Sequence, residues 1–368
     1  MSQMPERFLL VGIIPSDVPE SETLANLTEA VSLIESYGGQ VIDAILQKRD
    51  IHDKGMYIGS GKVDEVLEAI KEQRIDVVVL NSIIKPGQIY EFHKQLAQAN
   101  PQIQIWDKVD LILHIFSAHA QTAESKLQIE LAAMRHMGPR IYGMGDEMSQ
   151  QGGGIGTRGV GETNTELMKQ HWRKQIKITQ DKLKKLSADR QRLIDRRHKI
   201  GLKTVSIVGY TNAGKTSVFN KLVGKKKLAA NALFVTLDST VGKIYLPNLK
   251  AEVLVSDTIG FIQDLPPELI DAFRSTLLES VNADLLLHVI DIADPEYAKK
   301  IEVVENILTS LGVDHKQKIY IFNKIDVGDF NQANLTEKYR KFQPQFTSTL
   351  NGQGLNLLKQ AIDQALLV

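Results

Sequence analysis

Residues 209–216 read GYTNAGKT and match the phosphate-loop pattern G-x-x-x-x-G-K-[ST]. An apolar stretch at 204–208 precedes them, and the apolar spacing at 218–223 indicates a helix after them. In such a strand–loop–helix turn, backbone N–H groups surround a β-phosphate. The Lys215 ammonium can then reach the β- and γ-phosphates, and the Thr216 hydroxyl can ligate Mg²⁺. The nucleotide contacts predicted from this loop are Gly209, Tyr210, Thr211, Asn212, Ala213, Gly214, Lys215, Thr216 and Ser217.

Two short motifs at the ends of later strands indicate the metal and the base. Asp257-Thr258-Ile259-Gly260 follows the apolar stretch 251–256. Asp257 would hold Mg²⁺ through water, and the N–H of Gly260 would sense the γ-phosphate. Asn323-Lys324-Ile-Asp326 follows 318–322, and the Asp326 carboxylate can accept from the N1–H and the exocyclic amine of guanine. Adenine offers no such donor pair, so the sequence predicts GTP or GDP as the ligand.

Phe234-Val235-Thr236 is the candidate first switch, since a threonine there would close over Mg²⁺ only when the γ-phosphate is present. The predicted metal ligands are therefore Thr216, Thr236 and Asp257, and the predicted catalytic groups are Lys215, Thr236 and Gly260. Ser348-Thr349-Leu350 stands where a loop supports guanine, and it is expected to act mainly through its backbone. The four motifs in this order predict a GTP hydrolase that uses Mg²⁺.

Two residues beside these motifs shape the expected chemistry. Phe261 follows Gly260, where many GTPases carry a glutamine that orients the attacking water. A phenylalanine side chain can neither donate nor accept a hydrogen bond. We therefore expect slow intrinsic hydrolysis that rises when a partner orders the switches. Asn212 can help to coordinate K⁺ beside the phosphates, or it can be an ordinary turn asparagine; the sequence leaves both readings open.

The elements that must position these residues alternate between strand and helix, which indicates an α/β protein with mostly parallel sheets. We expect three regions: an N-terminal α/β domain at 1–107, an antiparallel helical hairpin at 108–202, and a GTP-binding domain at 203–368. In the first region, strands are predicted at 8–14, 41–46, 75–80 and 102–106, with helices at 22–37, 62–70 and 88–99. In the last, strands are predicted at 204–208, 251–256, 285–291, 318–322 and 345–348.

The hairpin is predicted from two long stretches without Gly or Pro, 110–137 and 163–200. Between them, the glycine-rich stretch 138–162 is expected to form a tip loop. The second stretch carries a heptad seam, in which arginine occupies two positions. The seam consists of Trp172, Ile176, Thr179, Leu183, Leu186, Arg190, Leu193, Arg197 and Ile200.

Charge is distributed unevenly along a chain whose net charge is zero. Residues 164–203 carry 13 Lys/Arg and 4 Asp/Glu. Such a run is typical of a solvated helix face, but its concentration in one helix also favours a polyanionic partner. The chain has no cysteine, no apolar run long enough to span a membrane, and no signal-peptide pattern. We expect a monomer in the cytoplasm.

The tip contains a second glycine motif, because 154–159 satisfies G-x-G-x-x-G. The polar residues 146–151 before it cannot form a buried strand, so it fails the context that a dinucleotide site needs. Two readings remain: a backbone-rich loop that enters a narrow RNA cavity with Arg158 as its charge, or a linker. The predicted RNA contacts are Gly154, Gly156, Arg158 and Gly159 in the loop, and Arg173 and Lys177 on the helix.

Taken together, these motifs resemble the HflX family of ribosome-associated GTPases. The most specific matches are GGGIGTRGVGET at 152–163, KLQIELA at 126–132, YIGSGK at 57–62 and DTIGFI at 257–262. The resemblance implies binding to the large ribosomal subunit and its RNA, splitting or rescue of stalled ribosomes under stress, and hydrolysis stimulated by the ribosome. A GTPase acting in ribosome assembly or on another structured RNA is the alternative. Val160 stands where the family usually has proline.

Overall fold

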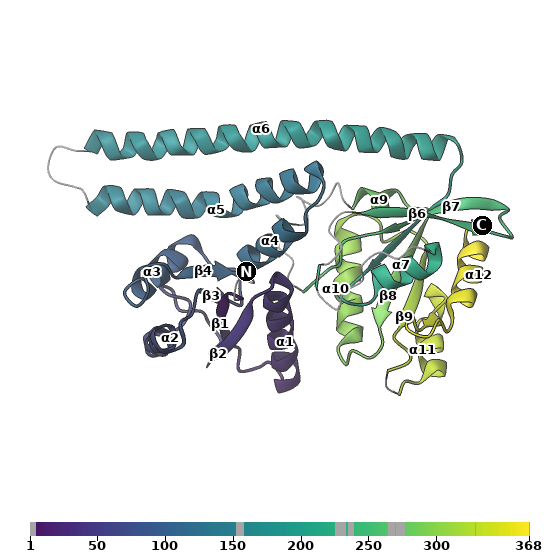
Figure 1. Ribbon diagram of the computed structural model, residues 1–368, viewed down its shortest axis with the longest axis horizontal. Helices are drawn as coiled ribbons and strands as arrows, with labels where there is room; N and C mark the ends of the chain where they lie inside the picture. Colours follow the sequence, from purple (N-terminus) through teal and green to yellow (C-terminus); the bar gives the residue numbers. More distant parts are fainter. Residues whose placement is uncertain are drawn as a thin grey trace. The chain divides into compact units, whose positions relative to one another are not determined.

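The computed structural model describes residues 5–151, 158–224, 233–234, 239–263, 269, 277–327 and 329–367 (Figure 1). The chain forms two compact units. The first comprises Met1–Ala118 and Leu127–Lys182, and the second comprises His119–Lys126 and Leu183–Val368. An N-terminal parallel sheet, a helical region and a C-terminal phosphate-loop domain are present, as the sequence predicted. In the described ranges, no helix is both long enough and apolar enough to cross a membrane.

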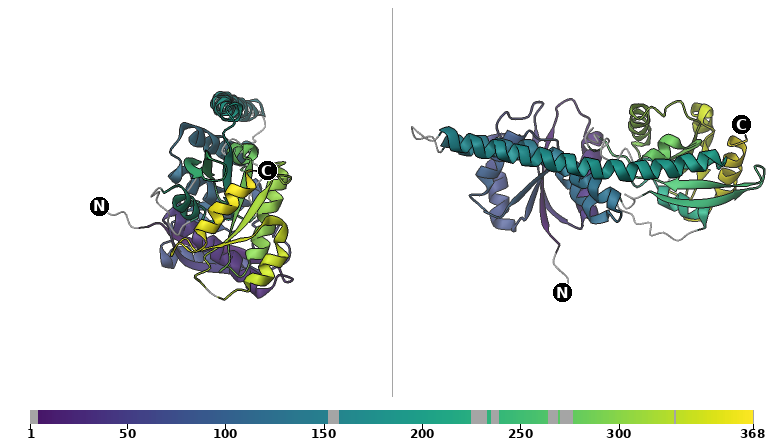
Figure 2. Two further views of the ribbon diagram at one scale, coloured as in Figure 1. Left: turned by 90° about the vertical axis from the view of Figure 1, so that its right-hand side faces the viewer. Right: turned by 90° about the horizontal axis from the view of Figure 1, so that it is seen from above.

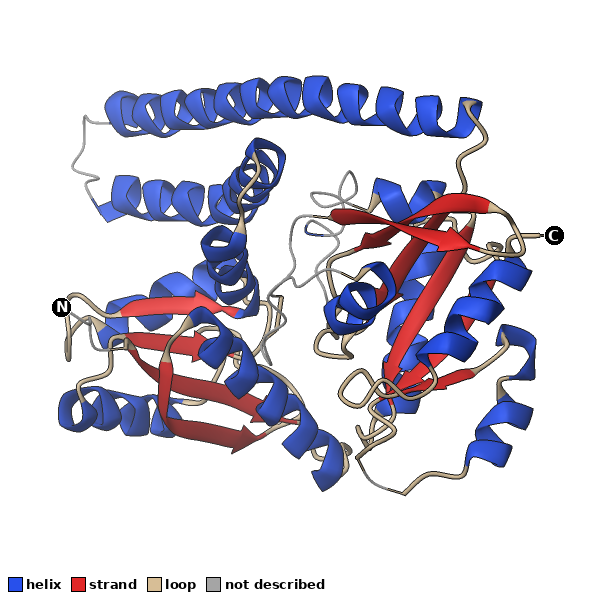
Figure 3. Ribbon diagram, turned by 45° about the vertical axis from the view of Figure 1, so that its right-hand side comes forward, coloured by secondary structure: helices blue, strands red, loops and turns tan. Residues whose placement is uncertain are grey.

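The first unit is built on a parallel sheet of four strands in the order β2-β1-β3-β4. The strands are β1 Arg7–Ile14, β2 Gln40–Lys48, β3 Val77–Leu80 and β4 Gln104–Asp107, and the helices between them are α1 Glu20–Tyr37, α2 Ser60–Gln73 and α3 Pro86–Leu96. Gly59 is the N-cap of α2, so the GSGK stretch forms a helix entry. Helix α1 covers one face of the sheet, and α2 and α3 cover the other (Figures 1 and 3).

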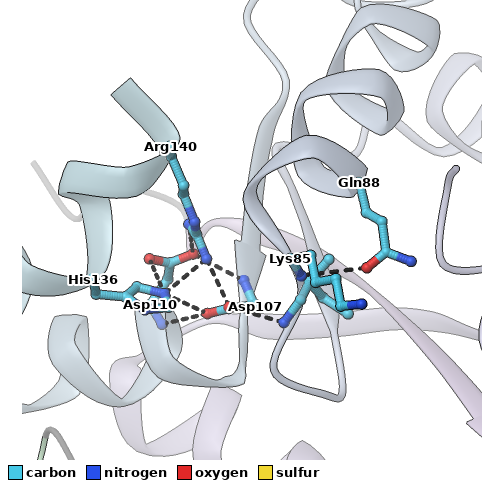
Figure 4. A network of polar contacts seen from close by, with 7 residues as sticks. Lys85, Gln88, Asp107, Asp110, His136 and Arg140 are labelled. Carbon is cyan, nitrogen blue, oxygen red and sulfur yellow. Dashed lines mark hydrogen bonds and ion pairs between the residues drawn. The ribbon is translucent and has the colours of Figure 1, made fainter. Parts of the chain in front are cut away.

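A buried ionic cluster lies where β4 leads into α4, Lys108–His119 (Figure 4). The Arg140 guanidinium donates at 2.6 Å to Asp107 and at 2.6 Å to Asp110, and His136 Nε2 lies 3.1 Å from Asp107 Oδ1. Burial raises the pKa of Asp107, but the hydrogen bond with His136 and the charges of His136 and Arg140 outweigh it, so this pKa is lowered. Burial and the charge of Asp107 raise the pKa of Asp110. The cluster therefore fixes α5 to the end of β4.

The helical region differs from its prediction in two places. The single helix expected over 110–137 is two helices, α4 and α5 Ala123–Gln151, because the Thr122 hydroxyl accepts from Ser125 N–H at 3.1 Å and starts a new helix. The loop expected over 138–162 is mostly helical, since α5 continues to Gln151 and α6 begins at Arg158. Each glycine costs a helix only about 1 kcal/mol relative to alanine, which long helices can absorb.

Helix α6, Arg158–Lys199, is continuous over its whole length (Figure 2). In the first unit it packs on α5, where Trp172 Nε1 donates to Met134 O at 2.8 Å and Thr179 is buried. The predicted seam is correct as far as Thr179, but it is wrong near the end of the helix. Leu193 is 57% exposed and Ile194 is buried, because a straight helix drifts from a seven-residue repeat by about 20° per heptad.

The second unit contains a six-stranded sheet in the order β10-β9-β8-β5-β7-β6. The strands are β5 Thr204–Gly209, β6 Thr240–Leu246, β7 Ala251–Asp257, β8 Leu285–Asp291, β9 Lys318–Asn323 and β10 Gln345–Thr347. The sequence prediction missed β6, which pairs antiparallel with β7. Its inward Gly242, Ile244 and Leu246 alternate with the exposed Lys243 and Tyr245, so the period-2 signal was present.

Helices cover both faces of this sheet (Figure 3). They are α7 Lys215–Val223, α9 Leu278–Asn282, α10 Tyr297–Ser310, α11 Gln332–Lys338 and α12 Leu355–Ala365, with a short 3₁₀ turn at Arg340–Phe342. Phe219 of α7 and Ile362 of α12 pack with β5 and β7 in one core, and Ile301 of α10 packs with Tyr320 and Phe322 in another. Together the two cores hold the carboxyl ends of β5, β7, β8 and β9 in place.

Replacing Arg140 by methionine is expected to destabilise the first unit by about 3–5 kcal/mol, because two carboxylates would be left buried without their cation. Both tryptophans of the chain, Trp106 and Trp172, lie in this unit, so tryptophan fluorescence during urea unfolding measures its free energy of unfolding. Arg173→Met is the control, since Arg173 is 72% exposed and 3.9 Å from its partner Glu166. Equal losses in the two variants would contradict the role of the cluster.

Candidate active site

The predicted nucleotide residues meet at the carboxyl ends of the parallel strands of the second unit, where α/β sheets bind ligands. The phosphate loop follows β5, Asp257 ends β7, and Asn323 ends β9. In the sheet, β7 is adjacent to β5, and β9 is separated from β5 by β8. Motifs that are more than a hundred residues apart in the chain therefore come together at one edge.

Lys215, the first residue of α7, is buried. Its Nζ donates to the carbonyl oxygen of Tyr210 at 2.6 Å, so the loop curves around the ammonium group. Burial lowers the pKa of Lys215 to about 8, although the charge of Asp257 acts in the opposite direction. A phosphate next to this ammonium would stabilise its charged form. The position thus favours an anionic ligand.

Thr216 and Asp257, two of the predicted metal ligands, lie side by side in the site. The Thr216 hydroxyl donates to Asp257 Oδ2 at 2.8 Å, and the Asp257 side chain is fully buried. A hydroxyl and a carboxylate beside a lysine that could bind phosphate form the oxygen donor set that Mg²⁺ prefers, with phosphate oxygens and water completing its coordination. The residues present therefore fit Mg²⁺.

Asn323 connects the phosphate loop to the strand that precedes the guanine motif. Its Nδ2 donates to Ala213 O at 3.0 Å, and its Oδ1 accepts from the Thr347 hydroxyl at 3.3 Å. Gly214 has φ +93°, and a Cβ there would lie 2.3 Å from Asn323 Nδ2. Only glycine allows the loop to approach Asn323 this closely. Asn323 is thus a structural link within the site.

The candidate guanine side contains Asp326, Lys324 and the loop after β10. Asp326 is exposed, which leaves its carboxylate accessible to a base. Lys324 Nζ donates to Asp291 Oδ2 at 2.6 Å, which holds the turn before Asp326. Ser348 is buried and its carbonyl accepts from Gly352 N at 2.9 Å, whereas Leu350 is 80% exposed.

Gly260 and Phe261 join the second switch motif to the phosphate loop. A Cβ on Gly260 would lie 2.7 Å from Lys215 Nζ and 2.9 Å from Thr211 Cα, so no larger residue fits. Phe261 N donates to Gly209 O at 3.2 Å, and Phe261 O accepts from Thr211 N at 2.7 Å. The Phe261 side chain is buried and belongs to the core.

Several predicted residues lie outside the described part of the chain. Val235, Thr236, Gly154 and Gly156 belong to this group. Phe234 is described, is buried and has φ +59°. Arg158 and Gly159 are in the first turn of α6, rather than in a loop, and Arg173 and Lys177 are exposed farther along that helix.

Sequence reasoning missed Asp291 and Thr347 as supports of the site. Asp291 ends β8 and holds Lys324, and Thr347 ends β10 and holds Asn323. A signal existed for Asp291, because it is an acidic residue at the end of an apolar strand, like Asp257. Thr347 gave no local signal, since its role depends on pairing of β10 with β9.

Comparisons with known proteins agree with this site. Residues 24–117 match the family described as GTP-binding GTPase N-terminal, and residues 119–197 match GTP-binding GTPase Middle Region. Residues 204–324 match 50S ribosome-binding GTPase.

The GTPase HflX of Caldanaerobacter subterraneus subsp. tengcongensis is 40% identical over 98% of this chain and 81% of its own length. The chain belongs to the GTPase HflX family. The HflX of Escherichia coli strain K12 is 34% identical over 94% of this chain and 80% of its own length.

Solved structures share the fold of this HflX-family chain. A GTP-binding protein from Sulfolobus solfataricus in complex with GDP aligns with a TM-score of 0.53 at 23% identity, covering 98% of each chain. A complex of SsGBP with GDP aligns with a TM-score of 0.57 at 24% identity over the same shares. These structures share the fold, and the family relationship shows that the chain is a GTPase that hydrolyses GTP.

Replacing Asp326 by asparagine is expected to lower GDP affinity by about 100-fold or more, because the site loses the acceptor for two guanine donors. The asparagine amide can instead donate to the second carbonyl of xanthine, so affinity for XDP should rise. Fluorescence competition with GDP and XDP measures both affinities. Asp329→Asn is the matched control, because Asp329 is also exposed and lies three residues farther on. A variant that binds both nucleotides as the control does would rule out guanine recognition by Asp326.

Proposed function

We propose that this GTPase binds the large ribosomal subunit and splits or rescues stalled ribosomes under stress. The observation that supports this most directly is the exposed positive charge of α6, in a chain whose GTPase region matches a ribosome-binding family. Ribosomal RNA is a polyanion with closely spaced phosphates, which such a helix can contact. Nucleotide binding in the second unit would then control this association.

The charge on α6 comes from residues that the fold leaves at the surface. Arg173, Lys177 and Lys184 are spaced four and seven residues apart and share one helix face. Six more basic residues on α6 are exposed, namely Lys174, Lys182, Lys185, Arg192, Arg196 and Lys199. Surface charges in this number, with few acidic neighbours, favour a phosphate backbone over a protein surface of mixed charge.

In this proposal, each group at the nucleotide site has a separate role. Lys215 contacts the β- and γ-phosphates, Thr216, Thr236 and Asp257 hold Mg²⁺, and the N–H of Gly260 contacts the γ-phosphate. When bound, Mg²⁺ supplies charge that stabilises the transferring phosphoryl group. Because the Phe261 side chain is buried, this switch residue provides no hydrogen bond to a water, which supports a low intrinsic rate.

A potassium ion is proposed as a second cofactor beside Asn212. This residue has φ +59°, a left-handed conformation that asparagine tolerates better than most residues. An additional cation next to the phosphates would supply positive charge in the transition state. An ordinary turn asparagine would adopt the same conformation. The GTPase rates in sodium and in potassium distinguish the two roles.

Co-sedimentation with large ribosomal subunits is expected to be stronger with a non-hydrolysable GTP analogue than with GDP. Replacing Arg173, Lys177 and Lys184 by glutamine should weaken it and lower the slope of log K against log salt by up to about 3. The matched control replaces the exposed Lys54, Lys71 and Lys94 of the first unit by glutamine. Equal binding in both nucleotide states would contradict the splitting role, and binding only to an assembly precursor would favour the alternative function.

The GTPase rate should rise when large subunits are added, because hydrolysis depends on a partner that orders the switches. The same assay in sodium and in potassium tests the second cofactor. A rate that does not change on adding subunits would contradict ribosome-stimulated hydrolysis, and equal rates in the two salts would exclude a role for K⁺.

A further inference from the structure

Two arginines interrupt the apolar seam of α6, and both belong to the second unit. Arg190 and Arg197 are seven residues apart and therefore lie on one face of the helix. Their side chains are only 19% and 27% exposed. An arginine that is mostly withdrawn from water is stable only when its donors are paired, so the partners explain why the seam tolerates these charges.

The partners come from three different segments of the second unit. Arg190 Nη1 donates to Glu124 Oε2 at 3.1 Å, and Arg190 Nη2 donates to the Ser239 hydroxyl. Arg197 Nη1 lies 3.2 Å from both carboxylate oxygens of Glu279. Arg190 Nη2 also lies 3.8 Å from Glu279 Oε1, which makes Glu279 the shared partner of the two arginines.

Two of these partners come later in the chain than the segments that are proposed to sense the γ-phosphate. Ser239 is three residues beyond Thr236 and immediately precedes β6. A three-residue connection spans at most about 10 Å, so Ser239 stays within that distance of Thr236. Glu279 lies in α9, the helix that follows the segment beginning with Asp257-Thr-Ile-Gly260.

Helix α9 is also connected to the strand that leads into the phosphate loop. The Ser280 hydroxyl, next to Glu279, lies 2.9 Å from the Ser206 hydroxyl of β5, and both are buried. Arg190 thus contacts the residue three positions after Thr236, and Glu279 connects α9 to α6. A nucleotide-dependent shift of Ser239 or of Glu279 would therefore act on these charge-assisted hydrogen bonds.

We propose that Arg190 and Arg197 are positioning residues that couple helix α6 to the nucleotide state through Ser239 and Glu279. Movement of the switches changes the pairing of the arginines, and this changes how firmly residues 183–199 are held on the GTPase core. Because coupling is reciprocal, a partner bound to α6 changes the relative affinities for GTP and GDP. The proposal rests on the proposed roles of Thr236 and Gly260 as γ-phosphate sensors, but it does not require a ribosomal partner.

The first experiment measures hydrogen exchange of the full chain with GDP and with a non-hydrolysable GTP analogue. The proposal predicts that residues 183–199 exchange at different rates in the two states. It also predicts that Arg190→Met and Glu279→Gln remove this difference. If peptides around 234–263 respond to the nucleotide but 183–199 do not, the coupling is wrong while the switch roles stand. If neither region responds, both proposals are wrong.

The second experiment compares the affinity ratio for the GTP analogue and GDP among matched variants. Arg190→Met should change this ratio by about fivefold or more, which is the lower end of typical coupling. Arg190→Lys should restore part of the ratio, since lysine keeps the charge but lacks the planar fork. Arg192→Met is the control, because Arg192 is 77% exposed and pairs with Asp189 on the surface of the same helix. A merely structural role for Arg190 would lower both affinities equally, and that result would overturn the proposal.

Discussion

The Lys215 ammonium is buried at the start of α7, and the rest of the site is built around that charge. Its hydrogen bond goes to the neutral carbonyl of Tyr210, and burial lowers its pKa to about 8. Gly260 and Thr211 leave no space for a further side chain beside it. An anion is the ligand that best compensates such a cation, and the sheet order places the ends of β5, β7, β8 and β9, with the predicted nucleotide residues, around this position.

The site could be predicted from the sequence far better than the helical region could. A phosphate loop is encoded by a few consecutive residues, and strand ends recur at one edge of any parallel sheet. The helix break at 120–122 depends instead on one threonine cap, and the helical course of 138–151 shows that a long helix can absorb several glycines. Strand β6 carried a readable alternation but was missed because its exposed positions break the apolar run that marked the other strands.

Arg190 and Arg197 of α6 show that a local sequence pattern does not predict pairing between distant residues. The heptad spacing marked Arg190 and Arg197 as exceptions in an apolar seam, but it could not identify Ser239 and Glu279, which are 49 and 82 residues away from their arginine partners. Pairing over such distances depends on the tertiary fold. The partners explain the two exceptions, because they pair the arginines with the residue before β6 and with α9 inside the second unit.

Calorimetry of GDP binding at pH 8.5, in buffers that differ in ionisation enthalpy, tests the central role of the Lys215 charge most directly. The free site should hold a partly neutral lysine at this pH, because its pKa is about 8, and the bound phosphates should restore the proton. We therefore expect net proton uptake on binding in the wild type, and none in Lys215→Arg, whose guanidinium stays charged. No proton uptake in the wild type, or equal uptake in the variant, would contradict the account.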